Sequence, residues 1–237
     1  MSAQPLTLQL RVAEARELNP LIKTFTLRRE DGGVLPGFAA GAHIRVRVEL
    51  PDGSADWRHY SLINFSADAK ATDAPTAYVI AVRKEAEGRG GSRFMHERLR
   101  EGDAITIEVP KNDFPLHTGP GGTVLLAGGI GVTPLASMAT RRRAEGLPVR
   151  MHYAGRSRDL MAFVPELEAL LADDLVSARK KTDREPPRAV DEAREEAISM
   201  AGLDRGTRAV EEMPGVDDGG DSGGFVTDQV GRVGQAI

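Results

Sequence analysis

Six short segments in the first 110 residues alternate apolar and polar side chains with period two. Such alternation is typical of strands with one buried face and one solvated face. Turns that contain glycine and proline, such as DGGVLPG and PDGS, separate the segments and favour antiparallel pairing. The segments are TLQLRVAEAREL, LIKTFTLRRE, HIRVRVELP, WRHYSLI, AYVIAVRKE and DAITIEVP. With one short helix before the last of them, they predict a small antiparallel β-barrel.

The short helix is predicted over SRFMHERLREGD, between the fifth and sixth strands. Serine is a preferred N-cap residue and glycine a preferred terminator of helices. We therefore expect Ser92 to cap this helix and Gly102 to stop it.

After residue 116 the pattern changes to apolar runs followed by helical periodicity. TVLLAGG predicts a strand buried on both faces, and VRMHYAG predicts its neighbour. Between them TPLASMATRRRAEG predicts a helix with Thr133 as N-cap, Pro134 in the first turn and Gly146 at the end. DLMAFVPELEALLAD predicts a second helical region that starts again at Pro165. Strand–helix–strand–helix is the opening of a parallel α/β sheet.

The last 61 residues differ from the rest in charge and apolar content. Residues 1–176 hold 22 basic and 22 acidic side chains, whereas residues 177–237 hold 9 and 13, which accounts for the net charge of −4. Only ten of those 61 residues are Leu, Ile, Val or Phe, too few to offset the conformational entropy of folding. We therefore expect a barrel domain over 1–116, an α/β domain over 117–176 and a disordered acidic tail over 177–237.

Composition excludes several classes of protein. The chain of 237 residues has no cysteine, so it forms no disulfide, thiolate zinc site or cysteine-held iron–sulfur cluster. It has no run of 18 apolar residues and no signal-peptide pattern, and a cytoplasmic protein is expected. The five histidines lack metal-ligand spacing, so no metal site is predicted. The basic triplet at 141–143 ends a predicted helix, where it favours the helix dipole rather than nucleic acid.

Three motifs are candidates for binding chemistry. Arg58, Tyr60 and Leu62 share one face of a predicted strand, which suits a ligand with a flat ring and a phosphate; an exposed arginine beside a half-buried tyrosine is the alternative. Gly88–Arg93 opens onto a helix and offers free N–H groups to an anion; a flexible loop is the alternative. Gly128–Pro134 follows a buried strand, where open α/β sheets bind nucleotides; a tight turn alone also needs glycine there.

The order of these motifs resembles the ferredoxin–NADP reductase superfamily. RHYSL in a barrel strand, GRGGSRFMHERLREGD with PKNDFPL after it, and GGIGVTP with HYAGRSRDLMAF after it are similar to the phthalate dioxygenase reductase and vanillate O-demethylase reductase group. The resemblance covers residues 5 to about 175. It implies a flavin-dependent oxidoreductase that passes electrons from NAD(P)H through FMN to an iron–sulfur protein of an oxygenase system, a separate ferredoxin or oxygenase component.

The resemblance also implies roles for individual residues. Arg58 would pair with the flavin phosphate, Tyr60 would lie against the flavin and its ribityl chain, and Ser61 would hydrogen-bond near flavin N5. The other implied flavin contacts are Leu62, Ala81, Val82, Gly90, Gly91 and Ser92. The implied contacts of the nicotinamide nucleotide are Gly128, Gly129, Ile130, Gly131, Val132, Thr133, Pro134, Arg156 and Ser157. Ser61 and Thr133, the latter close to the hydride path, are the implied catalytic residues.

Cofactor identity is implied by the same resemblance. FMN is the usual flavin of this group rather than FAD, and NADH is its usual donor. Arg156 beside Ser157 would also accept the 2′-phosphate of NADPH. The implied reaction is hydride transfer from nicotinamide to flavin, followed by transfer of single electrons to the iron–sulfur carrier.

The chain departs from the family pattern after Val176. Relatives continue with further strands, a Cys-Gly-Pro segment and, in many cases, a ferredoxin domain, whereas this chain has no cysteine. TVLLAGG would then have only VRMHYAG as a neighbour, which leaves one edge of a buried strand open. We therefore expect a C-terminally truncated reading frame, shifted near residue 176. Two alternatives to the reductase remain open: a flavin-binding remnant with little nicotinamide turnover, and a free flavin reductase.

Overall fold

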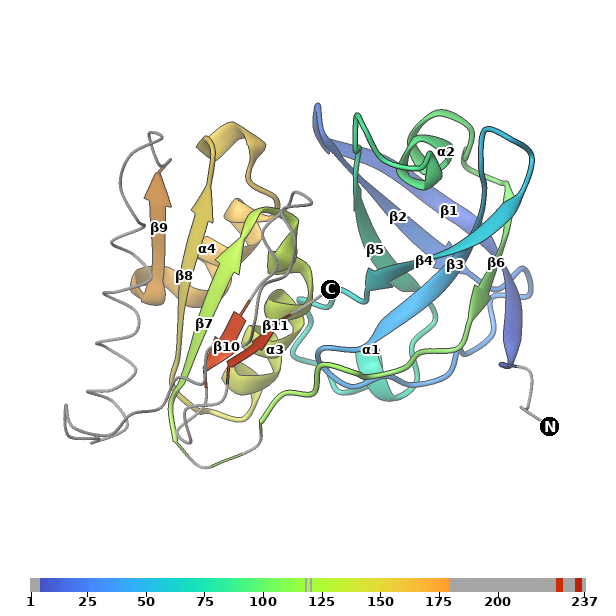
Figure 1. The fold of residues 1–237 in the computed structure, drawn as a ribbon. Helices are drawn as coiled ribbons and strands as arrows, with labels where there is room; N and C mark the ends of the chain where they lie inside the picture. The colour runs from blue at the N-terminus through green and yellow to red at the C-terminus, as the bar shows by residue number, and fades with distance from the viewer. Residues whose placement is uncertain (1–4, 118, 120, 180–224, 228–232, 236–237) are drawn as a thin grey trace. The chain divides into compact units, whose positions relative to one another are not determined.

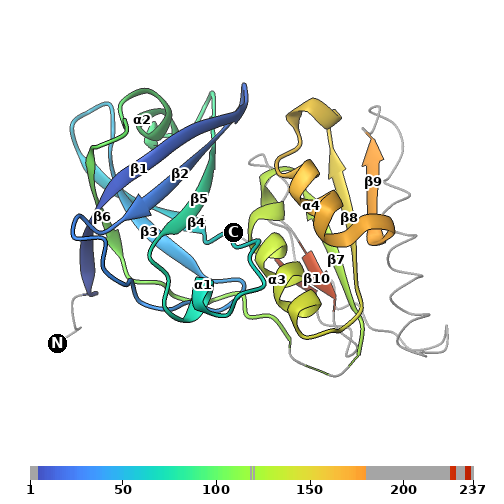
Figure 2. The same cartoon turned by 180° about the vertical axis from the view of Figure 1, so that it is seen from behind.

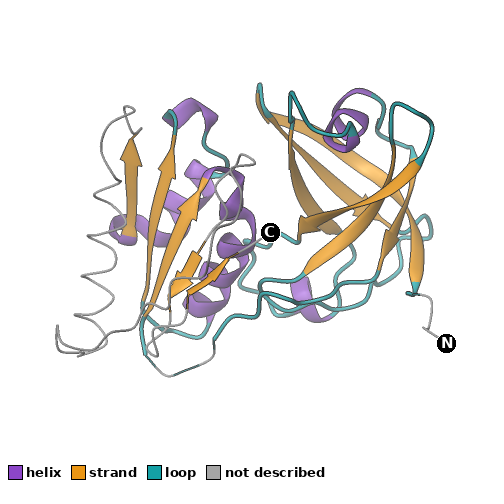
Figure 3. Ribbon diagram, in the orientation of Figure 1, coloured by secondary structure: helices purple, strands orange, loops and turns teal. Residues whose placement is uncertain are grey.

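The computed structural model describes residues 5–117, 119, 121–179, 225–227 and 233–235, with side chains up to Val176. The chain divides into two compact units, Met1–Pro115 and Leu116–Ile237. Each unit has strands and helices of its own (Figures 1 and 3).

The first unit is an antiparallel sheet of six strands that curls into an open barrel (Figure 1). The strands lie in the order β4-β3-β6-β1-β2-β5. The two edges approach each other where the N–H of Ile63, just after β4, donates to the carbonyl of Val79 in β5 (2.9 Å). All six predicted strands are confirmed: β1 (Thr7–Asn19), β2 (Ile22–Arg28), β3 (His43–Glu49), β4 (Ala55–Ser61), β5 (Tyr78–Arg83) and β6 (Ala104–Glu108).

Alternation of side chains explains how each strand closes the barrel. In β3 the side chains of Ile44, Val46 and Val48 are fully buried, whereas His43 and Arg45 point to the other face. A strand with period two places its apolar set on one side, so this pattern fixes which face turns inward. The buried cluster inside the barrel comprises Leu10, Val12, Phe25, Leu27, Leu35, Ile44, Val46, Val48, Leu62, Tyr78, Ile80, Val82, Met95, Leu99, Ile105 and Ile107.

Two short helices lie at opposite ends of the barrel, α2 (Gly91–Glu97) at one and α1 (Lys70–Asp73) at the other (Figures 1 and 2). The expected Ser92 cap is wrong, because Gly90 takes the cap position with φ of 101° and its left-handed backbone turns the chain into the helix. The Ser92 hydroxyl instead accepts the N–H of Glu85 (3.0 Å). The helix ends at Glu97, and Gly102 lies in the following turn with φ of 88°.

The second unit is a five-stranded sheet in the order β11-β10-β7-β8-β9. Its three parallel strands are β7 (Thr123–Gly128), β8 (Val149–Gly155) and β9 (Leu175–Arg179). Helices α3 (Val132–Ala144) and α4 (Val164–Leu171) lie on one face of this sheet (Figure 2). The predicted strand–helix–strand–helix order is confirmed, and α4 begins next to Pro165 as expected. Short 3-10 turns occupy Gly129–Gly131, Arg158–Leu160 and Ala172–Asp174.

The edge of β7 is covered, which differs from the expectation of a single neighbour. β10 (Phe225–Thr227) pairs antiparallel with β7 and with β11 (Val233–Gln235). β9 likewise continues past Val176 to Arg179. The remainder of the predicted disordered tail lies outside the residues that the structure describes.

The N-terminus of α3 also differs from the prediction. The 3-10 turn at Gly129–Gly131 leads directly into the helix, so Gly131 takes the cap position and Thr133 is already the second helical residue. The Thr133 hydroxyl donates to the carbonyl of Ile130 (3.0 Å) rather than accepting a free N–H. At the other end Gly146, with φ of 70°, closes the helix as predicted. Among the described residues, no helix is long and apolar enough to cross a membrane.

Candidate functional site

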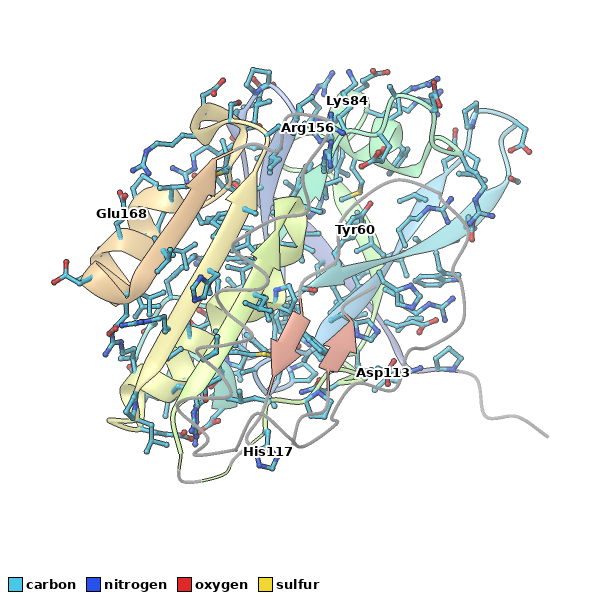
Figure 4. All side chains as sticks on the ribbon, turned by 60° about the vertical axis from the view of Figure 1, so that its left-hand side comes forward. Tyr60, Lys84, Asp113, His117, Arg156 and Glu168 are labelled. Atoms are coloured by element: carbon cyan, nitrogen blue, oxygen red, sulfur yellow. The ribbon has the colours of Figure 1, made fainter. Side chains whose placement is uncertain are left out.

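Strand β4 places Arg58 and Tyr60 on the inner face of the sheet. Arg58 lies opposite Val46 and Tyr60 opposite Ile44, two fully buried residues of β3. The common face predicted for Arg58, Tyr60 and Leu62 is therefore confirmed. Tyr60 packs against the barrel core (Figure 4), and burial raises the pKa of its hydroxyl well above the ordinary value of 10, so the hydroxyl keeps its proton.

The Arg58 guanidinium is held on one side and free on the other. Its Nη1 donates to Asp56 Oδ2 (2.5 Å) and to the carbonyl of Trp57 (3.0 Å). Its Nη2 is buried and has no hydrogen-bond partner among the described residues. Asp56 in turn accepts the N–H of Trp57 on Oδ1 (2.7 Å). The bond from Arg58, followed by that from Trp57, lowers the pKa of Asp56 below its ordinary value, so the carboxylate stays ionised.

The glycine-rich turn lies directly against Arg58. A Cβ added at Gly91 would come within 2.7 Å of Arg58 Nε and 3.0 Å of its Cγ. A Cβ at Gly90 would come within 2.5 Å of Pro51 Cδ, and Gly90 also has a left-handed backbone. Two of the three sequence motifs thus meet in space, and glycine is required where they meet.

This arrangement offers donors to a phosphate group. A buried donor without an acceptor is costly, and a phosphate oxygen would supply the missing acceptor to Arg58 Nη2. Arg89 adds a second cation nearby, with Nη2 at 3.7 Å from Asp56 Oδ2. The absence of a Cβ at Gly91 lets the Arg58 side chain lie against the backbone of this turn. The unpartnered donor of Arg58 and the nearby Arg89 therefore suit an anionic group.

The other residues that the family resemblance implies for the flavin are placed differently. Leu62 and Val82 belong to the fully buried barrel core. Ala81 is buried on the opposite side of β5 from Val82 and pairs with Thr24 of β2. Ser61 ends β4 half-buried and pairs with His43. The structure therefore brings Arg58 together with Gly90 and Gly91, and it places Leu62 and Val82 inside the core.

In the second unit, two loops leave the carboxyl edge of the sheet side by side. Gly128 ends β7 and pairs with Ala154 near the end of β8, so the loops that follow the two strands emerge at the same edge. Gly128–Pro134 comprises the end of β7, the 3-10 turn at Gly129–Gly131 and the start of α3. The loop after β8 contains Arg156 and Ser157, with Arg156 exposed (Figure 4). The carboxyl edge of a parallel sheet is where nucleotides bind in open α/β folds.

Tyr153 supports the first of these loops. Its hydroxyl donates to the carbonyl of Gly129 (3.1 Å) and accepts the N–H of Ala162 (3.0 Å). Burial raises the pKa of this hydroxyl far above its ordinary value, so the hydrogen-bond donor is retained. Gly129 has φ of 50°, a backbone conformation that favours glycine.

Sequence reasoning missed two residues of the site. Asp56 stands two positions before Arg58 on the same strand, so period two already places both side chains on one face. Tyr153 gave no comparable signal, because its contact with Gly129 joins positions 24 residues apart.

Comparison with known proteins identifies relatives of this chain. No family model matches the chain. The phthalate dioxygenase reductase of Burkholderia cepacia is 41% identical over 161 residues, which are 68% of this chain and 47% of the relative. The vanillate O-demethylase oxidoreductase of Acinetobacter baylyi is 39% identical over 156 residues, which are 66% of this chain and 46% of the relative. The solved structure of a phthalate dioxygenase reductase superposes with a TM-score of 0.66 at 33% identity, over 85% of this chain and 66% of that one.

The chain is a homologue of the oxygenase reductases. The resemblance to the ferredoxin–NADP reductase superfamily is thereby confirmed, and so is the fold class of a barrel followed by an α/β unit. This reductase homologue spans about half the length of the curated relatives that it matches.

Proposed function

We propose that this reductase homologue binds FMN and takes electrons from a reduced nicotinamide nucleotide, NADH in preference to NADPH, for a separate iron–sulfur component of a cytoplasmic oxygenase system. The observation that carries the proposal is the buried, unpartnered Nη2 of Arg58 beside Gly91, where a flavin phosphate fits. The relatives named as reductases of phthalate and vanillate oxygenases support the electron-transfer part.

In this proposal each residue of the first unit has one task. Arg58 binds the phosphate, and Gly90, Gly91 and Ser92 bind it at the start of α2. Tyr60 offers a ring surface to the ribityl chain and the flavin, and its raised pKa keeps the hydroxyl neutral. Ser61 offers a hydroxyl near N5, the reactive atom of the flavin. The bound flavin would supply the chemistry, since it accepts electrons in a pair and releases them one at a time.

In the second unit the proposed task is to orient the nicotinamide nucleotide. Residues Gly128–Pro134 run from the end of β7 into the first turn of α3, where a pyrophosphate would meet the backbone at the sheet's carboxyl edge. Thr133 would stand closest to the hydride path, and Arg156 with Ser157 would contact the adenosine half. Tyr153 keeps the loop in place through the carbonyl of Gly129. Orientation of the reacting groups and exclusion of water are the protein's contribution to the rate.

The test is flavin binding followed by anaerobic reduction with the purified full chain. We expect the protein to bind FMN and the flavin absorption to bleach on addition of NADH. Arg58→Ala should abolish the preference for FMN over riboflavin, because only FMN carries the phosphate. Arg47→Ala is the matched control, since Arg47 is exposed on β3 and, among the described residues, no hydrogen bond or ion pair joins it to Asp56 or Gly91.

Other outcomes separate the competing functions. Bound FMN that NADH does not reduce would identify a flavin-binding protein without nicotinamide turnover. Reduced flavin that leaves the protein, and is recovered in the filtrate when the mixture is ultrafiltered, would identify a free flavin reductase. A chain that binds no flavin would contradict the proposal.

A further inference from the structure

Both carboxylate oxygens of Asp56 are engaged. Oδ1 accepts the N–H of Trp57 (2.7 Å) and Oδ2 accepts Nη1 of Arg58 (2.5 Å). On the neighbouring strand the partner of Asp56 is Val48, a buried apolar residue. One oxygen of the carboxylate is therefore bonded to the backbone of β4, and the other holds the Arg58 guanidinium in place.

This pairing divides the Arg58 guanidinium into two halves. Nη1 is saturated by Asp56 and by the carbonyl of Trp57, whereas Nη2 has no partner among the described residues and is buried. Arginine has a long side chain with several rotatable bonds, and an arginine without the carboxylate would populate other rotamers. The contact to Asp56 thus selects the rotamer in which Nη2 is left for another acceptor.

We propose that Asp56 is a positioning residue that orients Arg58 and thereby makes the flavin site select FMN over riboflavin. This inference rests on the proposed function of the same site. Asp56 acts through Arg58 and does not itself bind the phosphate, because a carboxylate and a phosphate repel each other.

The geometry indicates that Asp56 orients Arg58 and does not compete with the phosphate for the guanidinium. A carboxylate that competed with the phosphate would cover the free end of the guanidinium, whereas Asp56 covers only Nη1. The charged groups that face Asp56 are Arg58 at 2.5 Å and Arg89 at 3.7 Å. Arg89 is largely exposed, with 79% of its side chain accessible, so Arg58 is the partner that Asp56 holds in place.

The experiment measures dissociation constants of FMN and riboflavin for the full chain and for Asp56→Asn. Asparagine keeps an oxygen for the Trp57 N–H and loses the charged acceptor of Nη1. We expect FMN to bind about tenfold more weakly, the typical effect of losing one charge-assisted hydrogen bond, while riboflavin binding changes less than about twofold. Asp52→Asn is the matched control: among the described residues the Asp52 side chain bonds only Ser54 in the preceding turn, and the substitution removes the same charge.

Two further variants make the result specific to the pair. In an Arg58→Ala background, Asp56→Asn should have no additional effect on the ratio of the two affinities, because the residue through which it acts is gone. Asp56→Glu should restore part of the preference for FMN. Tighter FMN binding in Asp56→Asn, or an unchanged ratio, would overturn the inference while leaving the proposed function intact. Failure of the unmodified chain to bind FMN would overturn both.

Discussion

At the scale of the residue, Arg58 shows what the local alternation of side chains can predict. Period two along WRHYSLI placed Arg58 and Tyr60 on one face, and the register of β3 and β4 confirms this. The same rule puts Asp56 on this face, and the structure shows that it binds Nη1 of Arg58. The contact with Gly91 joins residues 33 positions apart, so only the folded chain reveals it.

Gly91→Ala is the prediction that tests this contact. The new Cβ would lie within 2.7 Å of Arg58 Nε and displace the guanidinium. We expect FMN affinity to fall about tenfold, as for loss of one charge-assisted hydrogen bond, without loss of the fold. Fluorescence titration of FMN and a thermal unfolding curve measure the two effects.

Gly119→Ala is the control for the glycine substitution, because its Cβ would meet only the flexible ring of His117. It should leave FMN binding unchanged. An alanine at position 91 that binds FMN as tightly as glycine would show that Arg58 does not meet the phosphate there.

At the scale of the element, α3 carries a basic triplet whose members have different environments. The sequence placed Arg141, Arg142 and Arg143 in the last turn, which is confirmed. Arg142 is nevertheless 2% exposed, whereas Arg141 is on the surface. Arg142 donates to the hydroxyl of Thr123 (2.8 Å) and to the carbonyls of Gly119 and Gly121. A buried charge of this kind ties the segment before β7 to the helix.

Arg142→Met is therefore expected to destabilise the protein by about 2–4 kcal/mol, because the buried Thr123 hydroxyl and two part-buried carbonyls lose this donor. Arg141→Met removes only an exposed pair with Glu145 and should cost less than about 1 kcal/mol. Urea unfolding followed by circular dichroism measures both values. An equal decrease in the free energy of unfolding of the two variants would contradict the role assigned to Arg142.

At the scale of the whole molecule, the first of the two units contains histidines that make its stability depend on pH. Burial is the first cause that lowers the pKa of three histidines below the ordinary value of 6.5, and all three lie in the first unit: His43, His59 and His96. The rings of His43 and His59 are 5.0 Å apart, and the charge of His59 further lowers the pKa of His43. The folded barrel therefore favours the neutral form of these three rings.

The sign of the resulting pH dependence follows from linkage. A histidine with a lowered pKa in the folded state takes its proton more readily when unfolded. Its contribution to stability is present above the unfolded pKa near 6.5 and is lost as the pH falls below that value. We expect the urea concentration at the unfolding midpoint of the first unit to decrease when the pH is lowered from about 7.5 to about 5.5.

Trp57 makes this measurement specific, because it is the only tryptophan of the chain and lies in β4. Its fluorescence therefore follows unfolding of the barrel. Replacing His43 and His59 together by glutamine should reduce the difference between the two midpoints. A midpoint that rises on acidification would contradict the prediction.

Much of this architecture was predictable from short-range pattern. Six alternating segments predicted the six strands of the barrel, and TVLLAGG, VRMHYAG and the helices between them predicted the parallel unit. Helix ends were predicted less well. Gly90 and Gly131 take cap positions that Ser92 and Thr133 were expected to hold, because the preceding turn decides the backbone conformation there.

The sequence by itself determined which residues alternate, where the chain turns and which motifs follow one another, since these depend on neighbours a few positions apart. It also determined the family. Only the tertiary structure decided that Arg58 meets Gly91, that Tyr153 holds Gly129 and that Arg142 is buried. It likewise decided that β10, about 100 residues after β7, covers an edge expected to stay open. Each of these contacts joins distant segments, and its existence depends on how whole strands and helices pack.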